Sequence, residues 1–186
     1  MTNLIKSGYI KRYLITKDGV KGIQIIFGPD DVFPLNLVRK IIFKQDIYTG
    51  PEQYYYESMT DVEMFSTSPA TLQEALEKDP LIYKDVLYAA SLRLSSNIYR
   101  FENMSLRVAN KKVAHQLVYL ADIFGKKNED GTVIMVPLTH QDLADMLNLA
   151  RETVTLCLVR LEEKGLIRAG KHITVLDAEG LRQAFH

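Results

Sequence analysis

The feature that most constrains this chain is the stretch from residue 81 to residue 124, which contains neither proline nor glycine. Pro80 stands directly before it and Gly125 directly after it. Proline and glycine are the residues least compatible with a helix interior. Their absence predicts either one long helix or two helices joined near Ser105.

An apolar seam runs along this predicted helix, because its members recur at spacings of three and four residues. The seam residues are Val86, Ala90, Leu94, Asn97, Phe101, Met104 and Val108. Such a seam packs either on the protein's own sheet or on a second helix. We favour a symmetric homodimer, because the helix is too long for a small sheet to cover and Asn97 is the kind of polar residue that fixes pairing register.

The segment up to Ser68 has the pattern of a β-domain. "GYIKRYLIT" and "VKGIQIIF" flank the turn-forming "KDG", which predicts a hairpin. "GPDDVFP" then breaks the sheet, and further strands are expected at "QDIYTG", "EQYYYESM" and "VEMFSTS". Leu4 and Ile5 open an apolar segment with no element before them, so we expect a β-domain that is shortened at its start, with one exposed or borrowed edge.

Two local signals complete this half of the chain. Ser68 is placed to cap a short helix with Pro69 at its first position, and Pro80 ends that helix. The three consecutive tyrosines at positions 54–56 resemble a base-stacking platform. We interpret them instead as a strand with one aromatic residue packed inside.

The C-terminal third predicts a helix-turn-helix followed by a hairpin. After the turn "GKKNEDG" and a short strand in "TVIMVP", Thr139 and Asp142 have the spacing of a capping arrangement. Only residues 148–150 separate the helix that follows from the next one, a link so short that the two helices must cross steeply. "LIRAGKHITVL" then supplies two strands, the wing of a winged helix.

Composition excludes several kinds of protein. Lys plus Arg and Asp plus Glu both number 23, so any affinity for nucleic acid must come from local placement of charge. The single cysteine, Cys157, excludes an internal disulfide and a cysteine-only metal site. No apolar run has the length of a membrane span, and the start is too charged for a signal peptide. We expect a soluble, cytoplasmic protein with no membrane partner.

The second helix of the predicted motif, the recognition helix at residues 150–164, divides into two faces. Val154, Leu158 and Leu161 form a buried stripe, with Cys157 beside it. The residues that project away from it, and that we expect to contact DNA bases, are Arg151, Glu152 and Thr155. Arginine pairs with guanine O6 and N7, and a carboxylate accepts from the cytosine amino group. Thr153 and the backbone amides of this helix start are expected to meet phosphate. The alternative is a solvated first turn in which Glu152 only favours the helix dipole.

The order of features resembles the CRP/FNR superfamily of bacterial transcription regulators. The resemblance covers nearly the whole chain and is specific from about Leu138 to Leu176. It implies an α+β protein with an effector-type β-roll at residues 1–80, incomplete at its start, a dimerisation helix at 81–104 and a winged-helix DNA-binding domain at 105–186. It also implies RNA polymerase as a partner and phosphate contacts from Thr139, His140, Gln141 and Lys171.

The chain departs from the family pattern at three places. Ala150 replaces the usual small hydroxyl residue, and Leu156 replaces an arginine of the recognition helix. Leu156 either packs, which we favour, or touches a thymine methyl group. The Gly-Glu pair that precedes an arginine in cyclic-nucleotide sites is missing, and Arg39 stands without it. We therefore expect no cyclic nucleotide, no metal and no other cofactor, with the effector unknown; an iron–sulfur centre would need several cysteines.

Catalysis and protein interaction are the two alternatives to DNA binding. Catalysis is not expected, because Cys157 lies on the inner side of its helix and the histidines lack metal-site spacing. The alternative is a winged helix that serves ligand sensing or protein interaction without binding DNA. Salt dependence separates this alternative from a sequence-specific regulator acting as a homodimer on a palindromic double-stranded DNA site.

Overall fold

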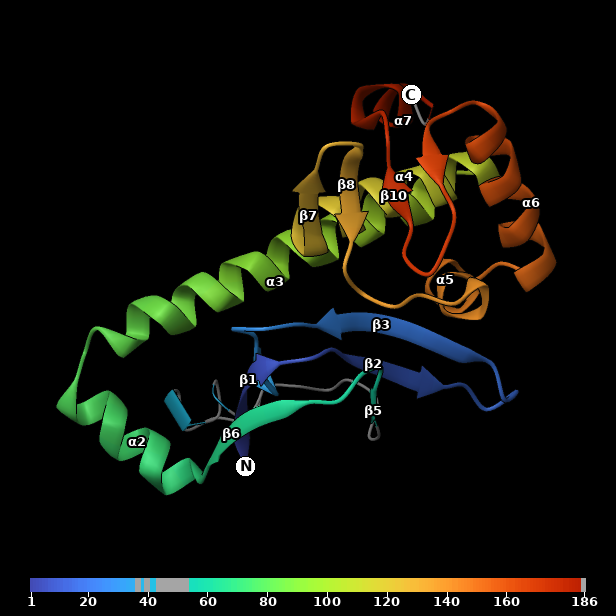
Figure 1. Ribbon diagram of the computed structural model, residues 1–186. Coiled ribbons are helices and arrows are strands. Elements are labelled where there is room, and N and C mark those ends of the chain that lie inside the picture. Colours follow the sequence, from blue (N-terminus) through green and yellow to red (C-terminus); the bar gives the residue numbers. More distant parts are fainter. Residues whose placement is uncertain (36–37, 39–40, 43–53, 185–186) are drawn as a thin grey trace. The chain divides into compact units, whose positions relative to one another are not determined.

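The computed structural model describes residues 1–35, 38, 41–42 and 54–184. The chain divides into two compact units, of which unit 1 comprises Met1–Leu14 and Ile25–Asn97 and unit 2 comprises Ile15–Gln24 and Ile98–His186. The mixed helix and sheet content, with antiparallel roll strands, long helices and a C-terminal helix-turn-helix, confirms the predicted α+β class (Figure 1). None of the helices in the described part of the chain is long and apolar enough to cross a membrane.

The β-roll consists of two small antiparallel sheets. One sheet has the strand order β4-β1-β6 and the other has the order β3-β2-β5. The strands are β1 (Thr2–Ser7), β2 (Ile10–Ile15), β3 (Lys21–Phe27), β4 (Val32–Phe33), β5 (Tyr55–Ser58) and β6 (Glu63–Thr67). The predicted hairpin is confirmed as β2 and β3, and the predicted strands near residues 55 and 63 are confirmed as β5 and β6. The strand expected at "QDIYTG" and the lone Arg39 lie outside the described residues.

A small apolar cluster holds these strands together. Its buried members are Ile5, Ile10, Ile25, Phe27 and Phe33. Tyr55 and Tyr56 are 37% and 40% exposed, and the Tyr56 ring stacks on Phe33 with 5.4 Å between centroids. One tyrosine of the predicted strand thus contacts the apolar cluster with an aromatic face.

The "GPDDVFP" segment was predicted only to interrupt the sheet, and this was partly wrong. Val32 and Phe33 form β4, paired with Leu4 and Asn3 of β1. The turn before it is closed by Asp31, whose Oδ2 accepts a hydrogen bond from the Gly28 amide at 2.8 Å. The Asp30 amide also donates to the Ile5 carbonyl at 2.9 Å. Pairing with the first strand therefore turns a sequence break into a third strand of that sheet.

Three helices follow β6 in succession along the chain. Helix α2 (Pro69–Lys78) has Ser68 as its N-cap, with the hydroxyl accepting from the Thr71 amide, and Pro at its start, as predicted. Helix α3 spans Ile82–Ser105 and α4 spans Ala109–Phe124, so the long stretch is two helices joined just after Ser105. Helix α3 begins in unit 1, and its last residues, from Ile98 onward, belong to unit 2.

The junction of α3 and α4 is held by buried polar groups. The Tyr99 ring stacks on His115 with 3.9 Å between centroids, and its hydroxyl donates to the His115 carbonyl at 2.7 Å. Asn103 is buried, and its amide donates to the Lys112 carbonyl at 2.8 Å and meets His115 Nδ1 at 3.1 Å. These bonds satisfy polar groups where one helix ends and the next begins, so the joint has a defined geometry.

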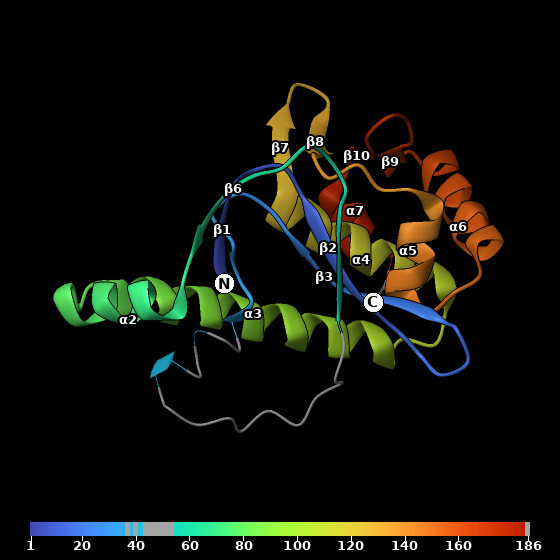
Figure 2. The ribbon, with the colours of Figure 1, turned by 90° about the horizontal axis from the view of Figure 1, so that it is seen from below.

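The rest of unit 2 is a winged helix built on α4. Its elements are β7 (Gly125–Asn128), β8 (Gly131–Ile134), α5 (His140–Leu147), α6 (Arg151–Glu163), β9 (Ile167–Arg168), β10 (Thr174–Val175) and α7 (Ala178–Gln183). The four strands form a sheet in the order β7-β8-β10-β9. Helix α6 packs against both α4 and α5 (Figures 1 and 2).

One expectation for this region was wrong. The segment "GKKNEDG" was predicted as a turn, but Gly125–Asn128 is strand β7, paired with β8. Only the last part turns, and there Asn128 Oδ1 accepts from the amides of Asp130 and Gly131 at 3.1 and 2.9 Å. The charged sequence reads as a loop because β7 is exposed along its whole length and has no apolar face to signal a strand.

Candidate nucleic-acid interface

The start of α5 is fixed by the predicted capping arrangement. The Asp142 amide donates to Thr139 Oγ1 at 3.0 Å, and Asp142 Oδ2 accepts from the Thr139 amide at 3.0 Å and hydroxyl at 2.6 Å. This capping box is confirmed, and it engages the Thr139 hydroxyl inside the protein. The amides of His140 and Gln141 are then the donors that this helix start presents.

The link between α5 and α6 is as short as predicted. Asn148 ends α5 in the left-handed conformation at φ 53°, and the Leu149 amide donates to the Ala144 carbonyl at 3.1 Å. Ala150 is the N-cap of α6 and makes no side-chain cap hydrogen bond. The loss of a capping hydroxyl therefore leaves the first amides of α6 without a side-chain acceptor.

Helix α6 has the two faces that the sequence predicted. Val154, Cys157, Leu158 and Leu161 are buried, each 3% exposed or less. Arg151 and Glu152 are exposed at the first turn. Leu156 is 58% exposed, so the interpretation that it packs was wrong. Leu156 stands in the sequence between the inward-facing positions 154 and 157, but neither α4 nor α5 covers its side chain.

Thr155 joins the two helices of the motif. Its Oγ1 lies 2.8 Å from Nδ1 of His140 on α5 and donates a hydrogen bond to the Arg151 carbonyl at 3.0 Å. Sequence reasoning assigned His140 to phosphate and Thr155 to bases, and it missed that these side chains bond to each other. The residues lie 15 positions apart, and only the steep crossing of α5 and α6 brings them together.

The wing carries one ion pair and one lysine. Arg168 Nη2 lies 2.7 Å from Asp130 Oδ2, which neutralises that arginine. Lys171 is exposed in the loop between β9 and β10. The Ala169 amide donates to Glu162 Oε1 at 2.8 Å, which ties the wing to the end of α6. The wing therefore presents two basic groups to solvent, Lys171 and the ion-paired Arg168.

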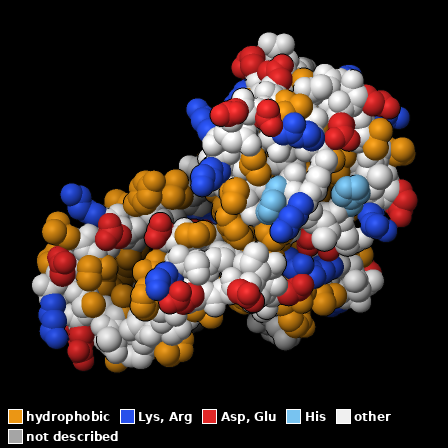
Figure 3. Space-filling view, viewed as in Figure 1, with side chains coloured by type: hydrophobic (Ala, Val, Ile, Leu, Met, Phe, Trp, Pro, Cys, Tyr) orange, Lys and Arg blue, Asp and Glu red, His pale blue; other side chains and the backbone are white. Residues whose placement is uncertain are grey.

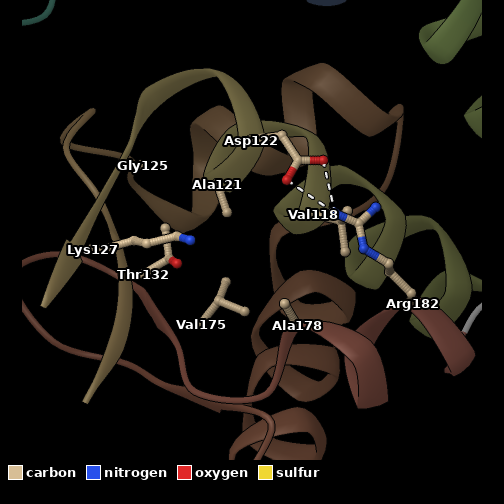
Figure 4. A pocket seen from close by; sticks show the side chains of 9 residues that line it. All are labelled: Val118, Ala121, Asp122, Gly125, Lys127, Thr132, Val175, Ala178 and Arg182. Atoms are coloured by element: carbon tan, nitrogen blue, oxygen red, sulfur yellow. Dashed lines mark hydrogen bonds and ion pairs between the residues drawn. The ribbon is translucent and has the colours of Figure 1, made fainter. Parts of the chain in front are cut away.

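A shallow hollow lies elsewhere in unit 2, between α4, α7 and the β7–β8 hairpin (Figure 4). Its volume is about 210 Å³, below the usual range for a small-molecule site. Arg182 closes one side by donating to both oxygens of Asp122 at 3.0 Å. No sequence signal pointed to this hollow, and none of the expected site residues lines it.

Cys157, the single cysteine of the chain, is buried on the inner face of α6. Burial raises the pKa of the Cys157 thiol, so the reactive thiolate is disfavoured. Within the described residues, no group of three or more His, Cys, Asp or Glu side chains is arranged to hold a metal ion.

The residues of the predicted α3 seam differ in their exposure to solvent. Leu94, Phe101 and Met104 are 62%, 71% and 66% exposed, and Val108, just beyond the helix, is 52% exposed. Ala90 and Asn97 are also exposed. Val86 is only half-exposed and lies seven residues before Arg93, on the face that packs within unit 1. Figure 3 shows hydrophobic side chains gathered over this helix.

The geometry defines a class of protein, in which a β-roll and a long helix are followed along the chain by a winged-helix domain. Comparison with known proteins agrees, since the family model of the Crp-like helix-turn-helix domain matches residues 111–184. The chain is 28% identical over 178 residues to the global nitrogen regulator of Synechococcus elongatus, covering 93% of this chain and 80% of the relative. It is 27% identical to a CRP-like cAMP-activated global transcriptional regulator of Mycobacterium tuberculosis, covering 96% of this chain and 76% of the relative.

Solved structures share the fold. FixK2 from Bradyrhizobium japonicum superposes with a TM-score of 0.77 at 18% identity, over 100% of this chain and 87% of that one. A CRP-family transcriptional regulator from Thermus thermophilus gives 0.72 at 19% identity, over 99% and 87%. Residues 111–184 thus carry a Crp-like helix-turn-helix domain, and the whole chain is similar to transcription regulators of the CRP/FNR type.

Proposed function

We propose that this protein is a sequence-specific transcription regulator that binds a palindromic DNA site as a homodimer. The observation that supports this most is the division of α6, whose one face is buried against α4 and α5 while Arg151, Glu152 and Leu156 lie exposed on the other. The start of such a helix is the part that enters the major groove.

The exposed residues suggest which bases are read. Arg151 can donate two parallel hydrogen bonds to guanine O6 and N7, and Glu152 can accept from a cytosine amino group. Leu156 is exposed four residues after Glu152, where its side chain can contact a thymine methyl group. A carboxylate repels phosphate, so Glu152 is better suited to choosing bases than to general attraction.

Phosphate contacts would surround this reading surface. On one side, the DNA phosphate backbone would meet the open amides at the starts of α5 and α6 and the side chains of His140, Gln141 and Thr153. On the other side, it would meet Lys171 of the wing. Gln141 also donates to Asp145 at 2.6 Å, which holds its amide group at the helix surface. Thr139 would contribute through its place in the cap rather than through a free hydroxyl.

The dimer would form through the outer face of α3. Four apolar residues of this face are each more than half exposed: Leu87, Leu94, Ile98 and Phe101. Their successive spacings are seven, four and three residues. An exposed apolar stripe of this period matches the seam of a two-helix coiled coil. A two-fold dimer would place the two recognition helices on half-sites about one helical turn apart.

The signal that unit 1 senses is proposed to differ from a cyclic nucleotide. The Mycobacterium tuberculosis relative is described as cAMP-activated. This chain lacks the Gly-Glu pair expected before the arginine of such a site. RNA polymerase is the proposed protein partner, by analogy with the family.

The test is a selection from a random duplex library at two salt concentrations, followed by sequencing of the bound DNA. We expect a two-fold symmetric site, with affinity that falls as salt rises because phosphate contacts release counterions. The double variant Arg151→Ala, Leu156→Ala is the matched control and should recover no consensus. Enrichment of the same site by this control would mean that Arg151 and Leu156 do not read the bases. No enrichment by the wild-type protein at either salt would favour a winged helix that serves protein contacts.

A further inference from the structure

We propose that Thr155 is a positioning residue that orients His140 toward a DNA phosphate, and that it does not read a base. The inference rests on the proposed function, since it assigns roles within the same interface. It also changes one sequence-based assignment, because Thr155 was expected to contact bases.

Both the hydrogen and the oxygen of the Thr155 hydroxyl take part in hydrogen bonds within the protein. Its one hydrogen is donated to the Arg151 carbonyl at 3.0 Å, and its oxygen lies 2.8 Å from Nδ1 of His140. A hydroxyl has one hydrogen to give, so the oxygen accepts from His140 and the proton sits on Nδ1. A base contact through the same hydroxyl would require both bonds to break, whereas Arg151 and Glu152 are exposed and need no such exchange.

The consequence for His140 is a fixed ring. A hydrogen bond at one ring nitrogen sets both the tautomer and the orientation, which leaves Nε2 as the free polar atom. His140 is half-buried at the first position of α5, a helix start whose open amides are suited to phosphate. Since a phosphate oxygen only accepts hydrogen bonds, the proposed contact requires a proton on Nε2 as well, so His140 would meet the phosphate as an imidazolium.

The charged groups of the two helices leave this contact open. On α5, Asp142 is held by Thr139 and Asp145 by Gln141. On α6, Arg151 and Glu152 occupy the exposed first turn. When the recognition helix docks, its Thr155 therefore orients a phosphate contact on the neighbouring helix. The bond couples base reading by α6 to the position of the DNA backbone.

The test compares Thr155→Val, which keeps the shape and removes the hydroxyl, with Thr155→Ser, which restores it. Affinity of the whole protein is measured for the selected duplex and for single-base variants of it, over a series of salt concentrations. Thr155→Val should weaken binding to every duplex on the order of tenfold, as expected for loss of a charge-assisted hydrogen bond. It should flatten the slope of log affinity against log salt by about 0.9 for each half-site.

Two further variants sharpen the result. His140→Gln should reproduce both effects, and adding Thr155→Val to it should change little more, because the two residues act as one unit. Thr155→Ser should restore affinity and slope. Thr153→Val, a matched loss of a threonine hydroxyl in the same helix, should leave the bond between His140 and position 155 intact, which nitrogen-15 NMR of the imidazole ring reports in the free protein.

A different pattern would overturn the inference. If Thr155→Val altered preference at one base position and left the salt slope unchanged, Thr155 would be a base reader. If the free protein carried its ring proton on Nε2, Nδ1 could not donate to Thr155, and the orienting bond as assigned would be absent. Either result leaves the proposed function standing, whereas failure of the wild-type protein to enrich any duplex would remove the proposed function while the NMR result still reports on the bond.

Discussion

Arg93 of α3 donates a hydrogen bond from Nη2 to Oδ1 of Asp31 at 2.7 Å, across 62 positions of the chain. Its guanidinium also lies 4.7 Å from the centre of the Phe27 ring. Asp31 is the residue that closes the "GPDDVFP" turn through the Gly28 amide. Within unit 1, one arginine therefore ties the long helix to both the turn and the apolar cluster of the roll.

Replacing Arg93 should measurably destabilise unit 1. Arg93→Met keeps much of the side-chain volume but leaves Asp31, whose side chain is 26% exposed, without its cation. We expect a loss of about 1–2 kcal/mol, reduced from a fully buried pair by solvent screening. Arg93→Lys should rescue it only partly, because an ammonium lacks the planar face over Phe27. Urea unfolding of a double-mutant cycle with Asp31→Asn measures the coupling; additive effects would contradict it.

The exposed face of α3 predicts which substitution dissociates the proposed dimer. Phe101→Asp should convert the dimer to monomers, because it places a charge in the apolar stripe where Phe101 is 71% exposed in one chain. Sedimentation velocity reports the change. Ile123→Asp, at a 50% exposed position of α4, is the matched control and should remain dimeric. Equal dissociation of both variants would argue against α3 as the interface.

Leu156 predicts a change of base preference. Leu156→Arg places a guanidinium on the exposed face one turn after Glu152, where it can pair with guanine. Selection from a random library should then replace an A·T pair by a G·C pair at one position of each half-site. Val159→Arg adds the same charge on the same helix, three residues further on, and should raise affinity for all duplexes alike. An unchanged consensus for Leu156→Arg would mean that Leu156 does not face the groove.

Arg151 and Lys171 should differ in what they contribute. Arg151→Ala should cost on the order of 1–3 kcal/mol on the preferred site and relax the preference for guanine. Lys171→Ala should weaken all sequences alike and reduce the salt slope by about 1. Binding titrations on preferred and random duplexes at several salt concentrations separate the two. Equal losses on both kinds of DNA for Arg151→Ala would refute base reading by this residue.

Tyr99 predicts alkaline sensitivity of unit 2. Burial, with a smaller contribution from the Asp122 carboxylate, raises the pKa of Tyr99 above its usual value near 10. Below that value the phenol is neutral in both folded and unfolded states, so its stabilisation is fully present. As the pH rises further, the unfolded chain loses the proton first and stability falls, by up to about 1.4 kcal/mol per pH unit.

The variant Tyr99→Phe isolates this effect. It should be less stable than the wild type near pH 8, by about 1 kcal/mol, because the hydrogen bond to the His115 carbonyl is lost. It should also lose less stability between pH 9 and 11, roughly the tyrosine range. Tyr88→Phe, at an exposed tyrosine of α3, is the control and should follow the wild-type pH dependence. Parallel curves for Tyr99→Phe and the wild type would contradict the assignment.

Most of the secondary structure could be predicted because its signals are local. Each such signal involves residues within about one turn of helix. Examples are the cap at Thr139 and Asp142, the three-residue link before α6 and the absence of a capping hydroxyl at Ala150. The joint near Ser105 was foreseen only as one of two options, because the groups that hold it come from both helices. Strand β4 was missed, since its pairing with β1 cannot be read from "GPDDVFP".

By itself, the sequence determined the helix-turn-helix and the two faces of α6, because periodicity and capping operate over a few residues. Tertiary structure alone decided that Leu156 is exposed, that Val86 lies on the inner face of α3, and that Thr155 bonds to His140. These outcomes depend on how helices cross and which surfaces they cover. Such relationships join residues far apart in the chain, and no local pattern specifies them.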